Sequence, residues 1–566
     1  MPALAESSLL DRFPAGSVVA EEGADQPTWI VERDVLVDVC RELKDGPETQ
    51  FDLLLESFGM DYPEREERFE VVLHLLSIPR NERLRIRVPL PAEDPRLPTL
   101  TGVWQGANWF ERELWDMFGF RVEGHPNLSR ILTHGAFQGH ALRKDYDPAR
   151  RWILTEADFY QPKFVFLPGY EQVSEDDMFE RMTVNIGPSH PAMHGTFRLM
   201  AVLDGETIVG SDVEIGYLHR CFEKMCETHT WQQAIPYTDR LNYCSSFINN
   251  RGYTRVVEQM LGIEAPPRAV WASTILSELS RIMDHCVCNG STLVDVGGLT
   301  NFWYLFQIRE EIYTLLERCF GARLTVSGTR VGGLMAELPP DFVDLCRHLL
   351  DYVPPRIADV EKLIDKNRIF LDRAVGVSAI SGADAVDWGW TGPCLRASGV
   401  GYDVRRARPY DLYDTLDFEV PVLQGGDVYD RYKVRMLEIR QSLSIVRQLL
   451  DRGMPEGPVI VDDPHVALPP KDAAYNQMEA MIYHFKLIMD GIQVPPGERY
   501  DCVEGANGEL GFYCVSDGGG KPYRVRCRPP CFPIFSAFPQ LVNGGSISDA
   551  IATLGGLNVI AGELER

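Results

Sequence analysis

Hydrophobic and polar residues follow two different periods along the chain. In the first quarter, 69–76 and 84–90 have the composition of strands, and the second run alternates apolar and basic residues as a half-exposed strand does. A tryptophan-rich helical pattern follows over 103–118, and we expect its aromatic side chains in the core, with an interface as the alternative. Residues 1–65 are interpreted as a small helical lead-in. These segments predict a compact α+β unit.

The pattern changes at 149–181, where the periodicity fades and prolines precede a cluster of acidic residues, as in a linker. Beyond it, two alternating runs flank Asp204-Gly205, a dipeptide typical of a hairpin turn. Helical patterns then dominate, and Trp271 to Cys288 is apolar on more than one face, which is typical of a central bundle helix. The tail returns to short strands. Helices are predicted over 217–230, 237–261, 267–290, 302–320, 340–366, 427–452 and 472–490.

The predicted fold class is α+β. We expect a small α+β domain over 1–148, a linker over 149–181, and a mainly helical bundle with peripheral β-strands over 182–566. The length of 566 residues with 45% hydrophobic and 24% charged residues excludes wholesale disorder. We expect no signal peptide, because the N-terminus has no basic region followed by an apolar run. We also expect no membrane span, because no run approaches roughly 20 apolar residues.

Charge and cysteine content limit the possible partners. With 82 acidic and 56 basic residues the formal net charge is -26, which disfavours a nucleic-acid partner and free binding to anionic lipid. Thirteen cysteines, spread over the whole length, suit a reducing compartment better than a disulfide framework.

The most suggestive short segment holds two histidines, His190 and His194. Two histidines four apart on a helix could share a metal. However, Pro191 biases His190 away from the helical region and Gly195 follows His194 directly, so at most one helical turn fits between them. We expect a loop between two strands that presents the imidazoles. A metal site, ordinary packed or surface histidines, and ligand binding are the alternatives.

Three further residues are weak candidates when each is taken alone. Tyr243 near the start of a long helical pattern is most often a core residue with a satisfied hydroxyl. Asp295, among apolar residues, is either a helix cap or the partner of a buried imidazole. Arg220 is most simply a salt-bridge residue.

Cysteine spacing argues against a redox cofactor held by this chain. Iron–sulfur and nickel sites use tight pairs such as C-x-x-C, and the chain has no such pair. A phosphate-binding glycine loop is also missing from the sequence, since Asp517 to Gly520 is more typical of a hairpin turn. We expect Cys221, Cys527 and Cys531 to be packing thiols, with a position near a cavity and metal binding as the alternative.

Longer motifs resemble two subunits of respiratory complex I. Glu111-Arg-Glu-Leu-Trp-Asp-Met-Phe-Gly-Phe and Gly124-His-Pro-Asn-Leu-Ser-Arg-Ile-Leu resemble the C subunit. From Asn185-Ile-Gly-Pro-Ser-His-Pro-Ala-Met-His-Gly onward, through Pro236-Tyr-Thr-Asp-Arg-Leu to Gly-Glu-Leu-Glu-Arg566, the chain is similar to the D subunit. The resemblance covers nearly everything after residue 65 and implies a fused C/D subunit of a bacterial NADH–quinone oxidoreductase.

The resemblance also implies a fold like that of the nickel–iron hydrogenase large subunit, together with a set of site residues. His194 and Tyr243 would bind the quinone headgroup, and Asp295 would be the partner of His194. Arg220 would lie beside the 4Fe–4S cluster of the partner B subunit, and His190 would line the same site. The chain itself would hold no cofactor, and quinone, with menaquinone as one candidate, would be the substrate.

The same resemblance implies a catalytic role only within a proton-translocating complex. The chain would be a peripheral protein on the cytoplasmic side of the cell inner membrane and would contact the membrane through its partners. Those partners would be the complex I subunits B, I, G, H and A.

One departure from the family and two rival functions are part of the interpretation. Thr325 stands where the family commonly has a histidine near the cluster. From this we hypothesise that the cluster has a lower reduction potential that is nearly independent of pH.

The rival functions are the large subunit of a membrane-bound nickel–iron hydrogenase-related complex and a scaffold without a quinone site. A basic stretch near the C-terminus is formed by Lys521, Arg524, Arg526 and Arg528. We expect it to be either a solvated strand face or a contact with a neighbouring protein of the complex.

Overall fold

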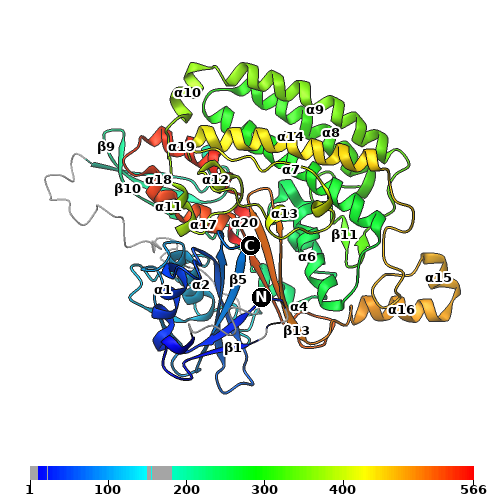
Figure 1. Ribbon diagram of the computed structural model, residues 1–566, viewed down its shortest axis with the longest axis horizontal. Coiled ribbons are helices and arrows are strands. Elements are labelled where there is room, and N and C mark those ends of the chain that lie inside the picture. Colours follow the sequence, from blue (N-terminus) through cyan, green and yellow to red (C-terminus); the bar gives the residue numbers. More distant parts are fainter. Residues whose placement is uncertain (1–9, 22, 24, 150–154, 156–180) are drawn as a thin grey trace.

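The computed structural model of the chain describes residues 10–21, 23, 25–149, 155 and 181–566. The predicted α+β class is confirmed, with a sheet-rich N-terminal region below a mainly helical later region (Figure 1). The segment predicted as a linker, 149–181, lies outside the described residues except for positions 149, 155 and 181. Within the described residues, no helix combines the length and apolar character needed to cross a bilayer.

A five-stranded sheet forms the core of the N-terminal region. Its order is β1-β2-β5-β4-β3, with β2 and β5 parallel and the other neighbours antiparallel. The predicted helical lead-in is wrong, because residues 1–65 contain three strands and only one α-helix among those described. The elements are β1 (Val18–Glu21), β2 (Thr28–Val31), α1 (Leu36–Asp45), β3 (Leu53–Asp61), β4 (Phe69–Ser77) and β5 (Glu82–Leu90).

The tryptophan-rich helix lies in the core, as predicted, although it begins later. Helix α2 (Ala107–Phe118) packs against β3, and Trp104, Trp109 and Phe110 are buried. A left-handed residue, Gly119, ends the helix by donating its backbone N–H to the last turn.

A second sheet covers the N-terminal one, which explains a wrong prediction about β5. The basic residues of that strand are not solvated: the buried side chain of Arg85 forms ion pairs with Asp25 at 2.8 Å and with Glu498 at 3.1 Å. Glu498 belongs to the C-terminal sheet, in which β14 pairs with β13 and β15. That sheet is buried between the N-terminal sheet and the helices, so its strands are not peripheral: β13 (Gly497–Glu504), β14 (Glu509–Ser516) and β15 (Arg524–Arg528).

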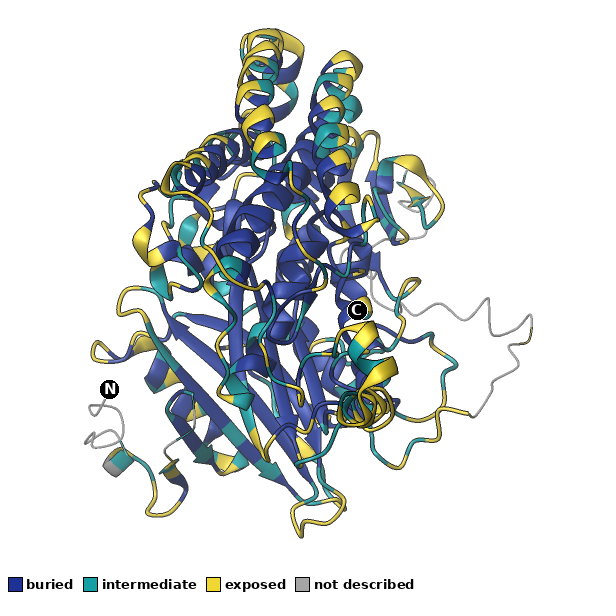
Figure 2. Cartoon of the chain, turned by 90° about the vertical axis from the view of Figure 1, so that its right-hand side faces the viewer, coloured by how far each residue is buried: buried dark blue, intermediate teal, exposed yellow. Residues whose placement is uncertain are grey.

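Helix α7 (Pro267–Asp295) is the centre of the bundle, as its apolar pattern predicts. It contacts α6, α8, α14 and α19, and it is buried over most of its length. Figure 2 shows buried residues along the inner helices and exposed residues on the outward faces of the outer ones. The surrounding helices are α6 (Ser246–Leu261), α8 (Leu299–Phe320), α9 (Phe342–Ile364), α14 (Val428–Arg452) and α19 (Ile547–Leu557).

A three-stranded antiparallel sheet lies at the start of the second region. The predicted hairpin is confirmed: β9 (Arg198–Asp204) and β10 (Thr207–Glu214) pair across a turn in which Gly205 has φ 61°. Strand β8 (Arg181–Ile186) pairs with the other edge of β9.

The remaining elements are short. They connect the sheets and the bundle, and the predicted helix at 217–230 is one of them, reduced to α4 (Phe222–Thr228). The others are β6 (Arg96–Pro98), β7 (Arg121–Glu123), α5 (Ile235–Thr238), β11 (Thr329–Arg330), β12 (Gly333–Leu334), α10 (Arg368–Ala374), α11 (Gly382–Asp387), α12 (Gly392–Ala397), α13 (Val404–Ala407), α15 (Lys471–Asn476), α16 (Met478–Met489), α17 (Cys531–Ser536), α18 (Phe538–Val542) and α20 (Ala561–Glu565).

Candidate functional site

The two histidines lie in the connection between β8 and β9, as predicted. A single 3-10 turn, Pro191–Met193, separates them, and His190 caps it by accepting a hydrogen bond from the Ala192 backbone N–H at 3.2 Å. His194 follows in the left-handed conformation with φ 56°. A non-glycine residue is uncommon there and is found where the surrounding structure holds it, often at functional sites.

His194 and Asp295 are brought together although they lie far apart in the sequence. The His194 Nε2 atom lies 2.6 Å from Asp295 Oδ2, and both side chains are largely buried. Asp295 is the last residue of α7. A negative charge is unfavourable at the C-terminal end of a helix, so helix capping does not explain an aspartate at this position. The neighbouring His194 imidazole does explain it.

The contact is close, but it lacks the alignment of a hydrogen bond. Within the described part of the chain, Asp295 Oδ2 has no hydrogen-bond partner of acceptable geometry. Helix α19 passes close by, since a Cβ atom on Gly555 would lie 3.3 Å from that same oxygen. The absence of a side chain at Gly555 therefore leaves room for the Asp295 carboxylate.

Tyr243 lies in a 3-10 turn, Tyr243–Ser245, that precedes α6. The predicted helix over 237–261 is thus interrupted, because Asn242 caps this turn through its side chain and accepts from the Cys244 backbone N–H at 3.1 Å. The Tyr243 side chain is 38% exposed. Partial burial raises the pKa of Tyr243 to about 12, and Cys244 and Asp284 contribute to the shift. Within the described residues its hydroxyl makes no hydrogen bond, so it is free to bind a ligand.

Arg220 is not the salt-bridge residue that its sequence context suggests. Its Nη2 atom donates to the backbone carbonyls of Arg240 at 2.8 Å and Gly562 at 3.2 Å. Among the described residues it has no carboxylate partner within ion-pair distance, and its side chain is exposed. Carbonyl oxygens orient the guanidinium without neutralising it, so its positive charge is retained.

The structure joins only one pair of the predicted site residues directly. His194 contacts Asp295, whereas no hydrogen bond or ion pair in the described ranges joins Tyr243 to His194. Both are nevertheless supported by α7: the Tyr243 turn packs on this helix, and the His194 turn packs on α19, which also contacts α7. His190 is exposed on its turn.

Comparison with known proteins identifies the family. Residues 29–151 match the model of the respiratory-chain NADH dehydrogenase 30 Kd subunit, and residues 295–566 match that of the 49 Kd subunit. The NADH-quinone oxidoreductase C/D subunit of Bdellovibrio bacteriovorus is 49% identical over 517 residues, which cover 91% of each chain. The chain belongs to the family of NADH-quinone oxidoreductase C/D subunits.

Other relatives extend this result over the whole length. The C/D subunit of Methylococcus capsulatus is 38% identical over 581 residues, covering 99% of this chain and 98% of the relative. The D 1 subunit of NADH-quinone oxidoreductase from Sorangium cellulosum is 52% identical over 387 residues, or 68% of this chain and 96% of that protein. Members of the C/D family belong to the peripheral arm of complex I, so other proteins of the complex are partners of this chain. The 49 Kd match implies a nickel–iron hydrogenase-like fold for the later region.

The structure corrects both predictions for the three arginines of the basic stretch, while both remain predictions for Lys521, which is exposed. The three arginines of β15 are buried, so they are neither a solvated face nor a contact with another protein of the complex. Arg526 bonds to Glu56 at 3.0 Å and to Glu223 at 3.2 Å, and it also pairs with Glu113. Sequence reasoning missed this because the partners lie far away in the chain.

The cysteines contribute no metal cluster within the described residues. All thirteen are free, and no group of three or more histidine, cysteine and acidic side chains there has the geometry to hold a metal ion. Cys527 and Cys531 are buried in the core, while Cys221 is partly buried and has its pKa raised to about 11, chiefly by burial. Each environment favours the neutral thiol.

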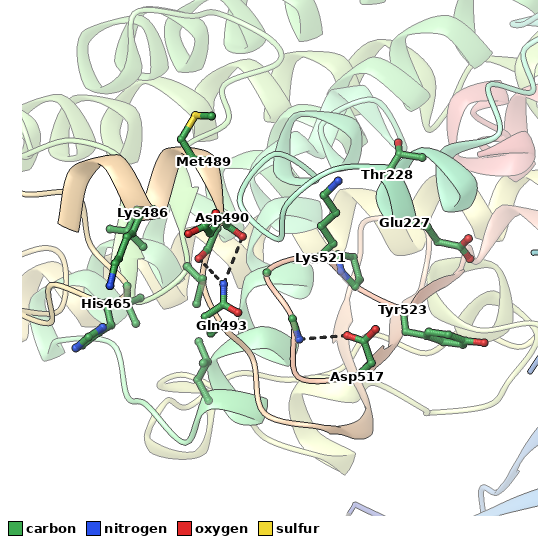
Figure 3. Close-up of a pocket in the computed structure, with 18 of the residues that line it drawn as sticks. Glu227, Thr228, His465, Lys486, Met489, Asp490, Gln493, Asp517, Lys521 and Tyr523 are labelled. Atoms are coloured by element: carbon green, nitrogen blue, oxygen red, sulfur yellow. Dashed lines mark hydrogen bonds between the residues drawn. The ribbon is translucent and has the colours of Figure 1, made fainter. Parts of the chain in front are cut away.

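A cavity of about 1220 Å³ lies at another place on the molecule (Figure 3). It is lined from both regions of the chain, by Lys144 and Tyr523 among others, and His194, Tyr243, Asp295 and Arg220 are not among its lining residues. Acidic and basic side chains both face it, including Asp490 and Lys521. The cavity is therefore separate from the residues that the family resemblance singles out.

Sequence reasoning missed a set of buried amides and one carboxylate beside Tyr243. Asp284 accepts hydrogen bonds from Asn242 and from Asn558, each at 2.9 Å. All three residues are at most 7% exposed. The signal available in the sequence was an aspartate inside the apolar pattern of the central helix, since such a residue needs polar partners.

Proposed function

We propose that this chain forms one wall of a quinone-headgroup site and takes part in quinone reduction within a proton-translocating NADH–quinone oxidoreductase. Its relatives are named as C/D and D subunits of NADH-quinone oxidoreductase. The observation that carries the proposal is the 2.6 Å pair of His194 and Asp295. It supplies an imidazole beside a carboxylate, and the phenol of Tyr243, on a turn that packs against the helix ending at Asp295, has no hydrogen-bond partner among the described residues.

The chemistry of a quinone suits these side chains. Its two carbonyl oxygens gain negative charge as electrons arrive, so a hydrogen-bond donor at each end stabilises the reduced form. Tyr243, with its pKa raised to about 12 mainly by burial, stays protonated at neutral pH and can donate. The Asp295 carboxylate lies 2.6 Å from the His194 imidazole, a side chain that can donate a hydrogen bond and deliver a proton.

The electrons would reach the quinone from a 4Fe–4S cluster in the partner B subunit. Arg220, whose guanidinium is held by two backbone carbonyls, would lie beside that cluster. His190 would line the same site from its exposed turn. The chain would contact subunits B, I, G, H and A and reach the cytoplasmic side of the membrane through them, with menaquinone as a candidate substrate.

Two domains with different tasks follow from this assignment. The α+β domain over 1–148 would dock the chain in the peripheral arm, and the domain over 182–566 would carry the quinone site. The relative that consists of the D subunit alone supports the division.

The test uses the assembled complex and two single substitutions. We expect Tyr243→Phe and His194→Ala each to lower quinone reduction about 10- to 100-fold, because each removes one donor from the developing oxyanion. Reduction of a soluble one-electron acceptor by the upstream part of the complex should be unchanged. Tyr475→Phe, at an 84% exposed tyrosine on α15, is the control. Full quinone reduction in both variants would show that the chain is a scaffold.

A further inference from the structure

The turn that carries Tyr243 is held from inside the protein by Asn242. The Asn242 side chain makes two hydrogen bonds: Oδ1 accepts from the Cys244 backbone N–H at 3.1 Å, and Nδ2 donates to Asp284 Oδ1 at 2.9 Å. Its backbone carbonyl accepts a third bond, from Asn249 at 2.9 Å. Asn242 is 1% exposed, so these bonds are not exchanged with solvent. The position of the phenol is therefore set by a buried amide.

Asp284 fixes that amide. This carboxylate lies on α7, is 1% exposed, and accepts from Asn242 on one oxygen and from Asn558 on the other, at 2.9 Å each. Within the described residues no lysine or arginine forms an ion pair with it, and the nearest cationic candidate is His285, whose Nδ1 atom lies 3.7 Å away. The hydrogen bonds to Asp284 come from amides, and the buried guanidinium of Arg435 acts on it only beyond ion-pair distance. A buried carboxylate held in this way is costly and contributes little to stability, which points to a functional reason for it.

The same carboxylate connects the two parts of the proposed site. Asn558 follows α19, the helix on which Gly555 lies against Asp295. Asn558 also donates to Asn507 at 2.6 Å, and Asn507 contacts the thiol of Cys531. Asp284 thus ties the Tyr243 turn to the end of the helix that borders the His194–Asp295 pair.

We propose that Asp284 is a positioning residue for Tyr243: through Asn242 it holds the turn in the conformation that aims the phenol at the quinone. This inference rests on the proposed function and adds a residue to it. Asp284 does not touch the substrate. Burial is the main cause of the raised pKa of Tyr243, and Cys244, Asp284 and Tyr313 add to it, which favours the protonated, donating form of the phenol.

The first test replaces each member of the link in the assembled complex. Asp284→Asn keeps the shape but sets an amide group against the amide donors of Asn242 and Asn558, and Asn242→Ala removes the link altogether. We expect each to lower kcat/KM for quinone about tenfold, with a raised KM, because a misplaced donor loses catalytic efficiency steeply. Reduction of a soluble acceptor by the upstream part of the complex should be unchanged. Ser280→Ala, at another buried polar position of α7, is the matched control.

A double-mutant cycle separates positioning from general damage. If Asp284 acts through Asn242, the Asp284→Asn/Asn242→Ala variant should be no worse than Asn242→Ala alone. Additive losses, or a full kcat/KM in either single variant, would overturn the inference. If one of the two single variants fails to assemble into the complex, kcat/KM of the other single variant tests the inference.

The pH–rate profile of quinone reduction gives an independent readout at its alkaline limb, where activity falls as Tyr243 loses its proton. Removing the Asp284 charge lowers the cost of forming the phenolate, so in Asp284→Asn this limb should move to lower pH. An unmoved limb would contradict the inference. Tyr243→Phe separates the two proposals: if it reduces quinone normally, the proposed site is wrong, whereas if only Asp284→Asn is without effect, the positioning role alone is wrong.

Discussion

At the scale of single residues, the candidate site depends on space as much as on charge. The Asp295 carboxylate has room beside His194 because Gly555, on the neighbouring helix α19, carries no side chain. A Cβ atom on Gly555 would lie 3.0 Å from Thr292 Oγ1 and 3.3 Å from Asp295 Oδ2, closer than ordinary van der Waals contact. The helix backbone itself would allow alanine there, so the constraint comes from packing.

Gly555→Ala should therefore reduce the rate of quinone reduction more than it reduces the stability of the folded chain. We expect the new methyl group to displace the Asp295 carboxylate from His194 and to lower quinone reduction several-fold, at a cost in stability of about 1–2 kcal/mol from overpacking. Thermal unfolding and quinone-reductase kinetics measure the two effects. Gly556→Ala is the matched control, because the three atoms nearest to its methyl group all belong to Val428, the first at 3.3 Å, and not to Asp295 or Thr292. Equal losses in both variants would contradict this explanation.

At the scale of elements, β15 illustrates what a sequence can and cannot predict. The long amphipathic helices and the hairpin at Asp204-Gly205 were predictable, because their signals are local periodicity and turn chemistry. The environment of Arg526 could not be predicted, since its partner Glu56 lies 470 positions away in the sequence. The same limit applies to the site: a motif identifies His194, but only the fold brings Asp295 to it and Asp284 to Asn242.

Arg526→Met should be strongly destabilising. It leaves Glu56, Glu113 and Glu223 without the guanidinium they share, and breaking a buried ion pair from one side costs about 3–5 kcal/mol. Arg318→Met is the control, because the Arg318–Asp341 pair is exposed and such pairs contribute about 0–1 kcal/mol. Chemical denaturation of the isolated chain measures the difference. A loss for Arg526→Met no larger than that of the control would mean that the carboxylates find other partners.

At the scale of the whole molecule, buried ion pairs join the N-terminal sheet to the later region. Arg83 on β5 pairs with Glu509 on β14 at 2.8 Å, and Arg85 pairs with Glu498 on β13. Glu223 lies at the same junction: burial opposes its charged form, yet Arg524, Arg526 and Arg566 together hold its pKa at about 2. Because the pKa of this glutamate is depressed in the folded state, its stabilising contribution is complete above its ordinary value near 4.5. The contribution is lost as the pH falls toward 2.

These contacts predict that the two regions stay together without a covalent connection. If a protease site is inserted within 156–180 and the chain is cleaved there, the two products should co-migrate in size-exclusion chromatography at pH 7. Moderate salt should not separate them, because buried pairs are screened far less than exposed ones. They should separate only at a pH well below 4.5, where Glu56 and Glu509 take up protons, because their ion-pair partners keep the pKa values of both carboxyls low although burial opposes the charged form. Separation at pH 7 would show that the ion pairs between the two regions contribute too little binding free energy to hold them together.

The relative that consists of the D subunit as a separate chain is the natural counterpart of this cleaved form, since that protein corresponds to the later region alone.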